Sequence, residues 1–351
     1  MTAMLKKYVV RSDLWIDSAF DTRLAQEPDV QLVVCKRQSP AEAVNETLAQ
    51  AHVYHIPATK DDLPAHWRAD AAFLARCPAL LCVSSSGSGY DTVDVAACTQ
   101  AGVAVVNQAG GNAQSVAEHA LGMMLGLAKR IQESDRKLRR TQGLTRESLM
   151  GHEISGKVLG IVGLGHTGTA VATLGRAFGM QVLASDPYLS AEEITHRGAT
   201  SVKLEELLAR ADVVSLHCPR NQETLKMFDA RAFAAMKPGS LFVTNARGGI
   251  HDETALLHAL QSGHLAGAGL DVWDQEPPPL DHPLLALDNV IATFHTAGVT
   301  HEARRNMAAI AAEQIAGLLR GERPPRLINP EVWPLYEKRY AALLGKAKKM
   351  A

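Results

Sequence analysis

The feature that most constrains this 351-residue chain is a glycine-rich segment that directly follows an apolar run. The run KVLGIV is followed by Gly163-Leu164-Gly165-His166-Thr167-Gly168, and a helix-like stretch comes next. In such a strand–turn–helix unit, Gly163 allows the tight turn and Gly165 lets the backbone approach a pyrophosphate. Gly168 lets the helix and the strand pack closely, and the helix N-terminus offers N–H groups to the anion. The segment therefore predicts a dinucleotide-binding βαβ unit.

Asp186 indicates which dinucleotide is bound. It ends the next apolar run, MQVLAS, 18 residues after Gly168. A carboxylate at this place accepts hydrogen bonds from the adenine ribose hydroxyls and repels a 2′-phosphate. No arginine follows directly, because the next residues are Pro187 and Tyr188. The pattern favours NAD over NADP.

Short apolar runs alternate with helix-like segments through most of the chain, which is typical of a parallel, doubly wound α/β sheet. Helices are expected at 41–50 and at 93–102, the second ending at Gly102. Strands are expected at 30–35, 80–84, 103–107, 157–163, 180–186, 211–219, 239–247, 265–273 and 289–295.

A single long helix is expected from about Ala113 to Arg140. Apolar residues recur there at three- and four-residue spacing, and the last turns are basic, as suits a helix C-terminus. A helix of this length would span about 42 Å. It could bridge two domains or form a subunit interface, and an ordinary surface helix fits the periodicity equally well.

Length and composition narrow the class of protein. At about 150 residues per domain, two domains are expected. The net charge of −1 argues against a nucleic-acid binder. No apolar stretch reaches the length of a transmembrane helix or a signal peptide. Five cysteines without a CxxC pair fit a reducing cytoplasm, and the 14 histidines show no metal-ligand spacing.

Three polar residues stand where parallel strands are expected to end. Arg247 follows FVTNA, Glu276 follows LDVWDQ, and His295 follows VIATF. Ligand sites of open α/β sheets lie at the carboxyl ends of the strands, so these residues can converge. A histidine can exchange a proton near neutral pH, a glutamate can stabilise its imidazolium and fix its tautomer, and an arginine can hold a carboxylate. This set suits hydride transfer between NAD and a hydroxy acid.

The chain resembles the D-isomer-specific 2-hydroxyacid dehydrogenases over roughly residues 75–335. This family includes phosphoglycerate dehydrogenase and hydroxypyruvate and glyoxylate reductases. The resemblance rests on ordered segments: GSGYDTVD (87–94), GVAVVNQAGGNAQSVAEHALGMML (102–125), GLGHTG (163–168), LHCP (216–219), NARGG (245–249), GLDVWDQEP (269–277) and FHTAG (294–298).

The resemblance implies a division of work among these residues. Arg247 would hold the substrate carboxylate and carbonyl, His295 would be the general acid or base, and Glu276 would pair with His295. Further positions are implied as parts of the NAD site. His166 and Thr167 would lie at the pyrophosphate; His217, Cys218, Pro219 and Thr224 at the adenine pocket; and Asn245, Ala246 and Asp271 towards the nicotinamide. Gly298 is a further expected cofactor-binding residue.

The loop Ser86-Gly87-Ser88-Gly89 would offer backbone N–H groups to the substrate carboxylate. Phosphoglycerate dehydrogenases usually carry an arginine in the loop before this motif, whereas this chain has Ser84-Ser85-Ser86. The change favours a smaller hydroxylated acid, with hydroxypyruvate or glyoxylate as the oxidised form. Phe294 replaces the proline that often precedes the catalytic histidine.

The resemblance also implies two Rossmann-like domains, with an NAD-binding domain inserted into a discontinuous, flavodoxin-like substrate domain. The boundaries would be 1–112 for the first part of the substrate domain, 113–297 for the NAD-binding domain and 298–351 for the returning helix and tail. A homodimer through the NAD-binding domain is expected, with no membrane or nucleic-acid partner and no metal.

Two other functions remain open from the sequence. One is D-3-phosphoglycerate dehydrogenase, if another basic residue replaces the missing arginine. The other is a non-catalytic NAD(H)-sensing binding protein, because some corepressors share the fold and its catalytic residues. A formate dehydrogenase is disfavoured because that group carries glutamine where this chain has Glu276.

Overall fold

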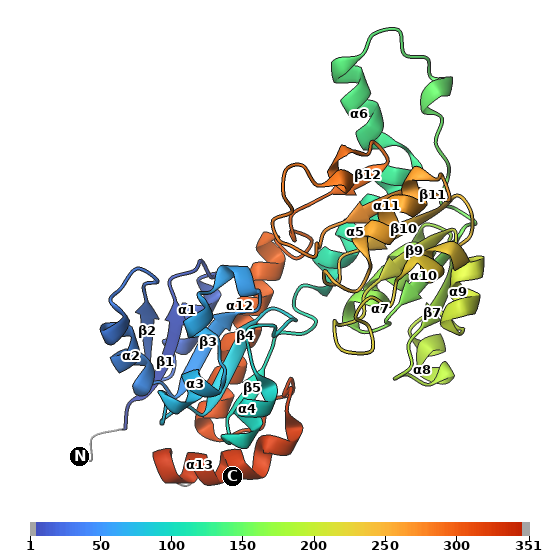
Figure 1. Cartoon of the computed structure of the whole chain (residues 1–351). Coiled ribbons are helices and arrows are strands. Elements are labelled where there is room, and N and C mark those ends of the chain that lie inside the picture. The colour runs from blue at the N-terminus through green and yellow to red at the C-terminus, as the bar shows by residue number, and fades with distance from the viewer. Residues whose placement is uncertain (1–4, 346–351) are drawn as a thin grey trace. The chain divides into compact units, whose positions relative to one another are not determined.

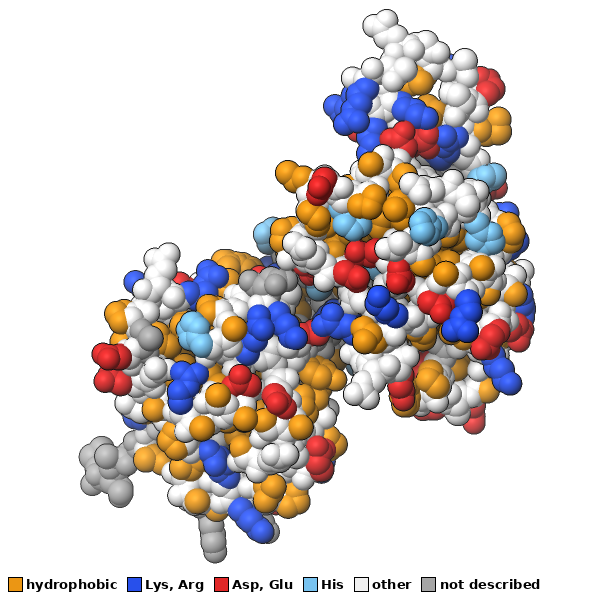
Figure 2. All heavy atoms as spheres, viewed as in Figure 1, with side chains coloured by type: hydrophobic (Ala, Val, Ile, Leu, Met, Phe, Trp, Pro, Cys, Tyr) orange, Lys and Arg blue, Asp and Glu red, His pale blue; other side chains and the backbone are white. Residues whose placement is uncertain are grey.

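The computed structural model describes residues 5–345, which form two compact units (Figure 1). Unit 1 contains the described residues up to Asn112 and those from His301 onward, and unit 2 runs from Ala113 to Thr300. The sequence places the two domain boundaries at 112/113 and 297/298, and the compact units change at 112/113 and 300/301. Figure 2 shows acidic and basic side chains interspersed over the surface in view.

Unit 1 is built on a five-stranded parallel sheet with the order β2-β1-β3-β4-β5. Its strands are β1 (Lys7–Ser12), β2 (Val30–Cys35), β3 (Val53–Pro57), β4 (Cys82–Ser86) and β5 (Ala104–Val106). Its helices are α1 (Ala19–Leu24), α2 (Ala41–Ala49), α3 (Ala71–Ala75), α4 (Val95–Gln100), α12 (His301–Arg320) and α13 (Trp333–Leu344).

Both faces of this sheet are buried, because successive strand residues point to opposite sides. Val9 and Val53 belong to the apolar cluster that contains α1, α12 and α13. Val10 and Tyr54, the next residues along, belong to the cluster that contains α2, α3 and α4. The sheet is therefore covered by helices on both sides.

Unit 2 is built on a seven-stranded parallel sheet with the order β12-β11-β10-β9-β6-β7-β8. Its strands are β6 (Val158–Val162), β7 (Gln181–Ser185), β8 (Thr200–Ser201), β9 (Val213–Leu216), β10 (Ser240–Thr244), β11 (Leu265–Leu270) and β12 (Val290–Ala292). Its helices are α5 (Ala113–Ala128), α6 (Ile131–Arg140), α7 (His166–Ala177), α8 (Ala191–His196), α9 (Leu204–Arg210), α10 (Ala230–Ala235) and α11 (Glu253–Gln261).

Helices also cover both faces of the second sheet. One apolar cluster joins strand residues such as Leu159 and Ile161 to α5 and α7. The other joins Val214 and Phe242 to α9, α10 and α11. The predicted α/β class with two doubly wound parallel sheets is confirmed.

The single helix expected from Ala113 to Arg140 is wrong, because the chain breaks between α5 and α6. Arg130 has φ 54°, in the left-handed region. Its guanidinium donates to both carboxylate oxygens of Glu133, at 2.7 and 2.6 Å, and to the Ser148 carbonyl at 3.0 Å. These contacts hold the turn after which α6 leaves the body of unit 2 (Figure 1).

Among residues 5–345, no helix combines the length and apolar character needed to cross a membrane.

Candidate active site

The expected site residues of unit 2 gather at one edge of the seven-stranded sheet. Every strand is parallel, so all carboxyl ends lie on the same side. Adjacent β6 and β9 mark the switch point of the strand order, where open α/β sheets bind ligands. The glycine loop follows β6, Asp186 follows β7, and the other expected residues follow the ends of β9, β10, β11 and β12.

The glycine loop has the backbone geometry that a pyrophosphate site requires. Gly163 has φ 89°, and a Cβ there would lie 2.7 Å from the Cys218 nitrogen. A Cβ at Gly168 would lie 2.2 Å from the Gly163 oxygen, so the helix could not approach the strand with any side chain there. At Gly165, by contrast, a Cβ would meet no atom within 4 Å. This open space lies at the N-terminus of α7, where His166 and Thr167 begin the helix.

Asp186 is tied to the glycine loop. Its Oδ2 accepts the Leu164 N–H at 2.8 Å, and its Oδ1 accepts the Tyr188 N–H at 3.0 Å. Each carboxylate oxygen keeps a further acceptor site, and the side chain is half-buried. The carboxylate is therefore held in one orientation with acceptor sites left over, which is what the predicted contact with a ribose needs.

The residues expected at the adenine pocket carry no charge that would compete with a nucleotide. His217 shares a 2.8 Å hydrogen bond with the Ser215 hydroxyl, and burial lowers its pKa to about 4. Burial raises the pKa of Cys218 to about 11, so the thiol stays protonated. Thr224 donates to the Pro219 carbonyl at 2.7 Å and closes the turn beside them.

His295 and Glu276 form an ion-pair geometry at the same edge. His295 Nδ1 lies 2.8 Å from Glu276 Oε2, and the side chains are 29% and 13% exposed. Glu276 Oε1 accepts the Trp273 N–H at 3.1 Å. Burial alone would raise the pKa of Glu276, but the hydrogen bond and charge of His295, assisted by Arg247, hold it below its usual value. The carboxylate is thus ionised and fixes the proton of His295 on Nδ1.

Asp271 fixes the loop that carries His295 through hydrogen bonds. The His295 backbone has φ 46° and donates its N–H to the Asp271 carbonyl at 2.7 Å. Asp271 Oδ1 accepts from the Thr293 hydroxyl at 2.6 Å and from the Thr296 N–H at 2.8 Å, and its Oδ2 accepts the Ala297 N–H at 3.0 Å.

This arrangement bears on the expectation that Asp271 contacts the nicotinamide. The Asp271 side chain is 1% exposed, and within the loop its Oδ1 accepts two hydrogen bonds and its Oδ2 accepts one. It therefore positions the His295 segment, and its Oδ2 keeps one further acceptor site. Gly298, further along the same loop, is half-buried.

Arg247 and its neighbours follow β10. Arg247 Nη1 donates to the Ala246 carbonyl at 2.7 Å, and its charge contributes to the lowered pKa of Glu276. Asn245 and Ala246 are buried, and the Asn245 amide oxygen is buried without a partner. Position 248, directly after Arg247, must be glycine because a Cβ there would lie 1.8 Å from the Trp273 oxygen. Arg247, Glu276 and His295 therefore meet at this edge, as the sequence predicts.

The loop Ser86–Gly89 lies in unit 1, at the carboxyl end of β4. Gly87 has φ 103°, which favours glycine. Its N–H donates to the Gln108 Oε1 at 2.7 Å, and the Gln108 N–H donates back to the Gly87 carbonyl at 2.7 Å. The Gly87 N–H is thus taken, contrary to the expectation that it is free for a carboxylate. Within residues 5–345, the N–H groups of Ser88 and Gly89 have no partner.

Several supporting residues were not singled out from the sequence. His119 on α5 shares a 3.1 Å hydrogen bond with the Thr293 hydroxyl, and the Trp273 indole donates to the Thr293 carbonyl at 3.0 Å. Arg197 donates to the Leu164 carbonyl at 2.6 Å. None has a motif of its own, although His119 and Trp273 lie inside segments that carry the family resemblance.

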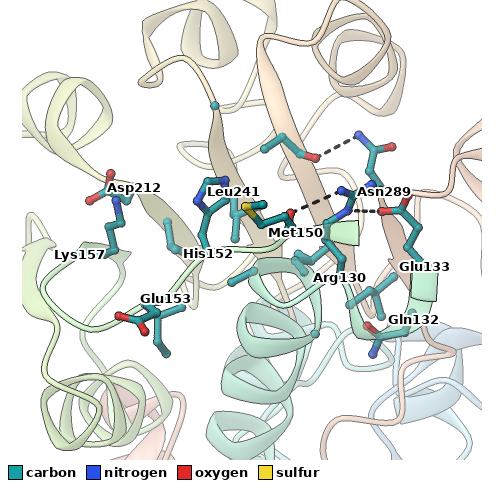
Figure 3. A pocket seen from close by; sticks show the side chains of 18 of the residues that line it. Arg130, Gln132, Glu133, Met150, His152, Glu153, Lys157, Asp212, Leu241 and Asn289 are labelled. Atoms are coloured by element: carbon teal, nitrogen blue, oxygen red, sulfur yellow. Dashed lines mark hydrogen bonds and ion pairs between the residues drawn. The ribbon is translucent and has the colours of Figure 1, made fainter. Parts of the chain in front are cut away.

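A further cavity lies elsewhere in unit 2. It has a volume of about 680 Å³ and is lined by the start of β6, β9 and β10 and by the α5–α6 turn (Figure 3). It therefore lies at the amino ends of the strands, opposite the candidate site. Among residues 5–345, no cluster of His, Cys, Asp or Glu could hold a metal ion.

Comparison with known families gives one clear assignment. Residues 121–297 match the family described as "D-isomer specific 2-hydroxyacid dehydrogenase, NAD binding domain". The match covers the glycine loop, Asp186 and the three residues Arg247, Glu276 and His295.

Curated relatives carry two different activities in their names. A D-3-phosphoglycerate dehydrogenase of Archaeoglobus fulgidus is 40% identical over 284 residues, which is 81% of this chain and 54% of the relative. A glyoxylate reductase of Korarchaeum cryptofilum is 38% identical over 268 residues, 75% of this chain and 80% of the relative. The chain thus spans about half the length of the D-3-phosphoglycerate dehydrogenases it matches.

Solved structures show the same fold. A glyoxylate reductase from Paecilomyes thermophila has a TM-score of 0.82 at 27% identity, covering 93% of this chain and 99% of its own. The TT0316 protein from Thermus thermophilus has a TM-score of 0.79 at 31% identity, covering 92% of this chain and 99% of its own.

Proposed function

Because the chain belongs to the D-isomer specific 2-hydroxyacid dehydrogenase family, we propose that it catalyses the NAD-dependent, reversible reduction of a small 2-oxo acid to the 2-hydroxy acid. The observation that carries this proposal is the 2.8 Å pair of His295 and Glu276 beside Arg247 at the carboxyl edge of the unit 2 sheet. Hydroxypyruvate and glyoxylate are the favoured oxidised substrates.

The dinucleotide fits the residues at this edge. Gly163, Gly165 and Gly168 would hold the pyrophosphate at the N-terminus of α7, and Asp186 would hold the adenine ribose. When bound, NAD supplies the hydride acceptor or donor. We propose that the buried segment at Asn245 and Ala246 borders the nicotinamide end, and that Asp271, whose Oδ2 keeps one acceptor site, also lies at this end.

The residues of the chain itself would bind the substrate carboxylate and transfer the proton. Arg247 has a planar guanidinium that can hold a carboxylate and polarise the adjacent carbonyl oxygen. His295 Nδ1 is occupied by Glu276, whereas Nε2 has no partner among the described residues. Nε2 would give its proton to the oxygen at C2 in reduction and take it back in oxidation, with the Glu276 carboxylate stabilising the imidazolium.

A second candidate substrate is D-3-phosphoglycerate, because several relatives of 40–43% identity carry that name. Against it, Ser84-Ser85-Ser86 offers no positive charge in the loop before the glycine motif. A phosphate dianion would lack one charge-assisted pair of hydrogen bonds there.

A screen of NADH oxidation with the purified full chain tests the proposal. Glyoxylate, hydroxypyruvate, pyruvate and 2-oxoglutarate are compared with each other, and 3-phosphoglycerate is tested with NAD⁺. Fastest turnover with hydroxypyruvate or glyoxylate is expected. Preference for 3-phosphoglycerate would establish the second candidate. NADH binding without turnover of any acid would indicate a sensor and overturn the enzymatic proposal.

The cofactor preference has its own test. Asp186→Ala removes the carboxylate that repels a 2′-phosphate, so the ratio of kcat/KM with NADPH to that with NADH should rise by about tenfold or more. Glu192→Ala, an exposed carboxylate on α8 of the same unit, is the matched control. An unchanged ratio in Asp186→Ala would contradict the role of Asp186.

We also propose that two copies of this chain associate through unit 2. The segment after Arg130 forms α6, none of whose residues is buried, and Leu138 on it is 75% exposed. Beside its base lies the 680 Å³ cavity, where Figure 3 shows Arg130 bonded to Glu133 and to the backbone at Met150. A projecting helix and a hollow on one unit suit exchange with a second copy.

Sedimentation at several protein concentrations tests this association. Leu138→Glu should shift the protein from dimer towards monomer, because it places a charge in the interface. Leu280→Glu, at a residue that is 99% exposed in a loop of the same unit, should leave the mass unchanged. A monomeric unmodified protein would contradict the proposal.

A reducing compartment, the cytoplasm, is proposed from the cysteines. All five are unpaired, and burial raises the pKa of Cys77 to about 11 and that of Cys98 to about 12. Protonated, buried thiols resist oxidation, and unpaired cysteines are the usual state of proteins in the cytosol.

A further inference from the structure

The loop that carries Glu276 leaves the body of unit 2 after Trp273 and returns to it at His282. Most of residues 274–281 are exposed, whereas Trp273 is 3% exposed and His282 is half-buried. An exposed loop moves more easily than the strands that it connects. The contact between Glu276 and His295 therefore depends on how the two ends of this loop are held.

Glu253, in the first turn of α11, holds both ends of the loop. Its Oε1 accepts the Asp274 N–H at 2.8 Å, and its Oε2 lies 3.2 Å from His282 Nε2. A carboxylate only accepts hydrogen bonds, so His282 Nε2 carries the proton of this contact. The side chains of Glu253 and His282 are each 15% exposed, so little water competes with them. One carboxylate thus closes the loop from Asp274 to His282.

Trp273 connects these contacts to the reacting pair. Its ring packs edge-on against the His282 ring, with centroids 5.5 Å apart. Its backbone N–H donates to Glu276 Oε1 at 3.1 Å, and Glu276 Oε2 is the oxygen that lies 2.8 Å from His295 Nδ1. Glu253 therefore acts on Glu276 through the adjacent peptide units of Asp274 and Trp273 and through the His282 ring.

The two ends of the loop differ in how far they depend on Glu253. Asp274 has a second anchor, because its Oδ1 accepts the Gly249 N–H at 2.7 Å. Among residues 5–345, His282 Nδ1 is buried without a partner, so Glu253 supplies the hydrogen bond that the ring makes. Removing the Glu253 carboxylate would release the end at His282 and weaken the end at Asp274.

We infer that Glu253 is a positioning residue for the reaction, because it keeps the Glu276 carboxylate within hydrogen-bond distance of His295. The inference rests on the proposed function, since it concerns the same reacting groups. Catalytic groups act only within a narrow range of geometry, and a displacement of about 1 Å can cost about 10²-fold in rate. Loosening the loop should therefore lower kcat while every group that exchanges the proton is still present.

The first test compares kcat with the affinity for NADH in the full chain. Glu253→Ala should lower kcat with the best 2-oxo acid at least tenfold. The dissociation constant of NADH should change less than threefold, because the glycine loop and Asp186 follow β6 and β7, away from Glu253. Equal losses of kcat and of NADH affinity would indicate general damage to unit 2 and would contradict a positioning role.

The matched control is Glu205→Ala. Glu205 is an exposed carboxylate in the first turn of α9, so its removal costs the same favourable charge at a helix N-terminus as the removal of Glu253. Both kcat and the NADH dissociation constant should stay unchanged in Glu205→Ala. A loss of kcat in Glu205→Ala as large as in Glu253→Ala would assign the effect to the helices and overturn the inference.

A double-mutant cycle shows whether Glu253 acts through Glu276. In the Glu276→Gln background the charge that Glu253 positions is already absent. Adding Glu253→Ala there should cost at least threefold less in kcat than it costs in the unmodified protein. Losses that simply multiply would show that the two residues act independently, and the inference would fail.

Amide hydrogen exchange separates the inference from the proposed function, because it needs no turnover. If no acid is turned over, the proposed function fails, but the exchange rate of the Trp273 N–H still reports whether Glu276 is held. This rate should rise at least tenfold in Glu253→Ala, although Glu253 bonds the N–H of the next residue, Asp274. It should not change in Glu205→Ala. Unchanged exchange of the Trp273 N–H in Glu253→Ala would overturn the inference.

Discussion

His55 in unit 1 and His295 in unit 2 have similar hydrogen bonds and opposite electrostatics. Each lies near the carboxyl edge of a parallel sheet, and each has Nδ1 bonded to an oxygen, at 3.0 and 2.8 Å. The partner of His55 is a buried hydroxyl, whereas the partner of His295 is an ionised carboxylate and its ring is partly exposed. Burial lowers the pKa of His55 and keeps its ring neutral, whereas the carboxylate beside His295 would stabilise an imidazolium. The surroundings of the ring, and not the imidazole itself, set these two histidines apart.

The largest effect is expected from removing the histidine that exchanges a proton. His295→Ala should lower kcat for 2-oxo acid reduction by about 10²–10⁴-fold, the usual contribution of general acid–base catalysis. His301→Ala, an exposed histidine at the start of α12, serves as the control. A loss below tenfold on the best substrate would remove His295 from the catalytic role and break the comparison.

Changing the partner of His295 should make it more like His55. Glu276→Gln keeps the shape but removes the charge, so kcat should fall by about 10²-fold because the imidazolium loses its stabilising carboxylate. Without the carboxylate the protonated ring is less stable. As the pH is raised, the remaining reductase activity of Glu276→Gln should therefore fall at a lower pH than that of the unmodified enzyme. An unchanged pH profile would show that Glu276 does not act through His295.

The hydrogen bonds that Asp271 makes to the His295 loop should contribute to the free energy of unfolding. Asp271→Asn replaces one acceptor oxygen by a donor, which leaves either the N–H of Thr296 or the buried N–H of Ala297 unpaired. The cost should be about 2 kcal/mol of the free energy of unfolding, measured by urea denaturation. Asp288→Asn, at an exposed residue of the same unit, should cost nothing measurable. A loss of NADH affinity without a loss of stability would instead assign Asp271 to the cofactor.

The smallest effect concerns the neutral state of His55. Its pKa is lowered to about 3 in the folded protein, against about 6.5 when unfolded, so between these values only the unfolded state binds the proton. Its contribution to stability is complete above pH 6.5 and is lost as the pH falls towards 3, by up to about 1.4 kcal/mol per pH unit. Urea unfolding at pH 7 and pH 5 should show a smaller pH dependence in His55→Phe than in the unmodified protein. An identical pH dependence would show that His55 is protonated in the fold.

Six of the seven strands of the unit 2 sheet, and the edge at which they end, could be predicted from the sequence because the signals are local; the two-residue strand β8 was missed. Buried parallel strands appear as continuous apolar runs, and a polar residue after each run falls at one edge whatever the rest of the chain does. Arg247, Glu276 and His295 were found by this reasoning. In unit 1, β1 and β3 were missed because KYVVRS and VYHIP mix polar and apolar residues.

Other features depend on contacts between distant segments. The break between α5 and α6 at Arg130 occurs without a glycine or proline at that position, so no local signal predicts it. The hydrogen bond from Arg130 to the distant Ser148 carbonyl helps to fix it. Glu253 lies in an ordinary helical pattern, and only the folded chain shows that it holds Asp274 and His282. The hydrogen bonds that Asp271 accepts from Thr293, Thr296 and Ala297 join the end of β11 to the loop after β12, and no local pattern predicts them.

The hydrogen bonds at the two ends of unit 2 have a consequence for how this architecture can arise. Ser115 and Thr300, near its first and last residues, share a 2.7 Å hydrogen bond between their hydroxyls. A domain whose ends meet can be placed within a loop of another domain, because the host chain needs to open only a narrow gap. The two ends of unit 2 therefore meet, as the ends of an inserted domain must. The order of the strands in unit 1 does not depend on the length of chain inserted between Asn112 and His301.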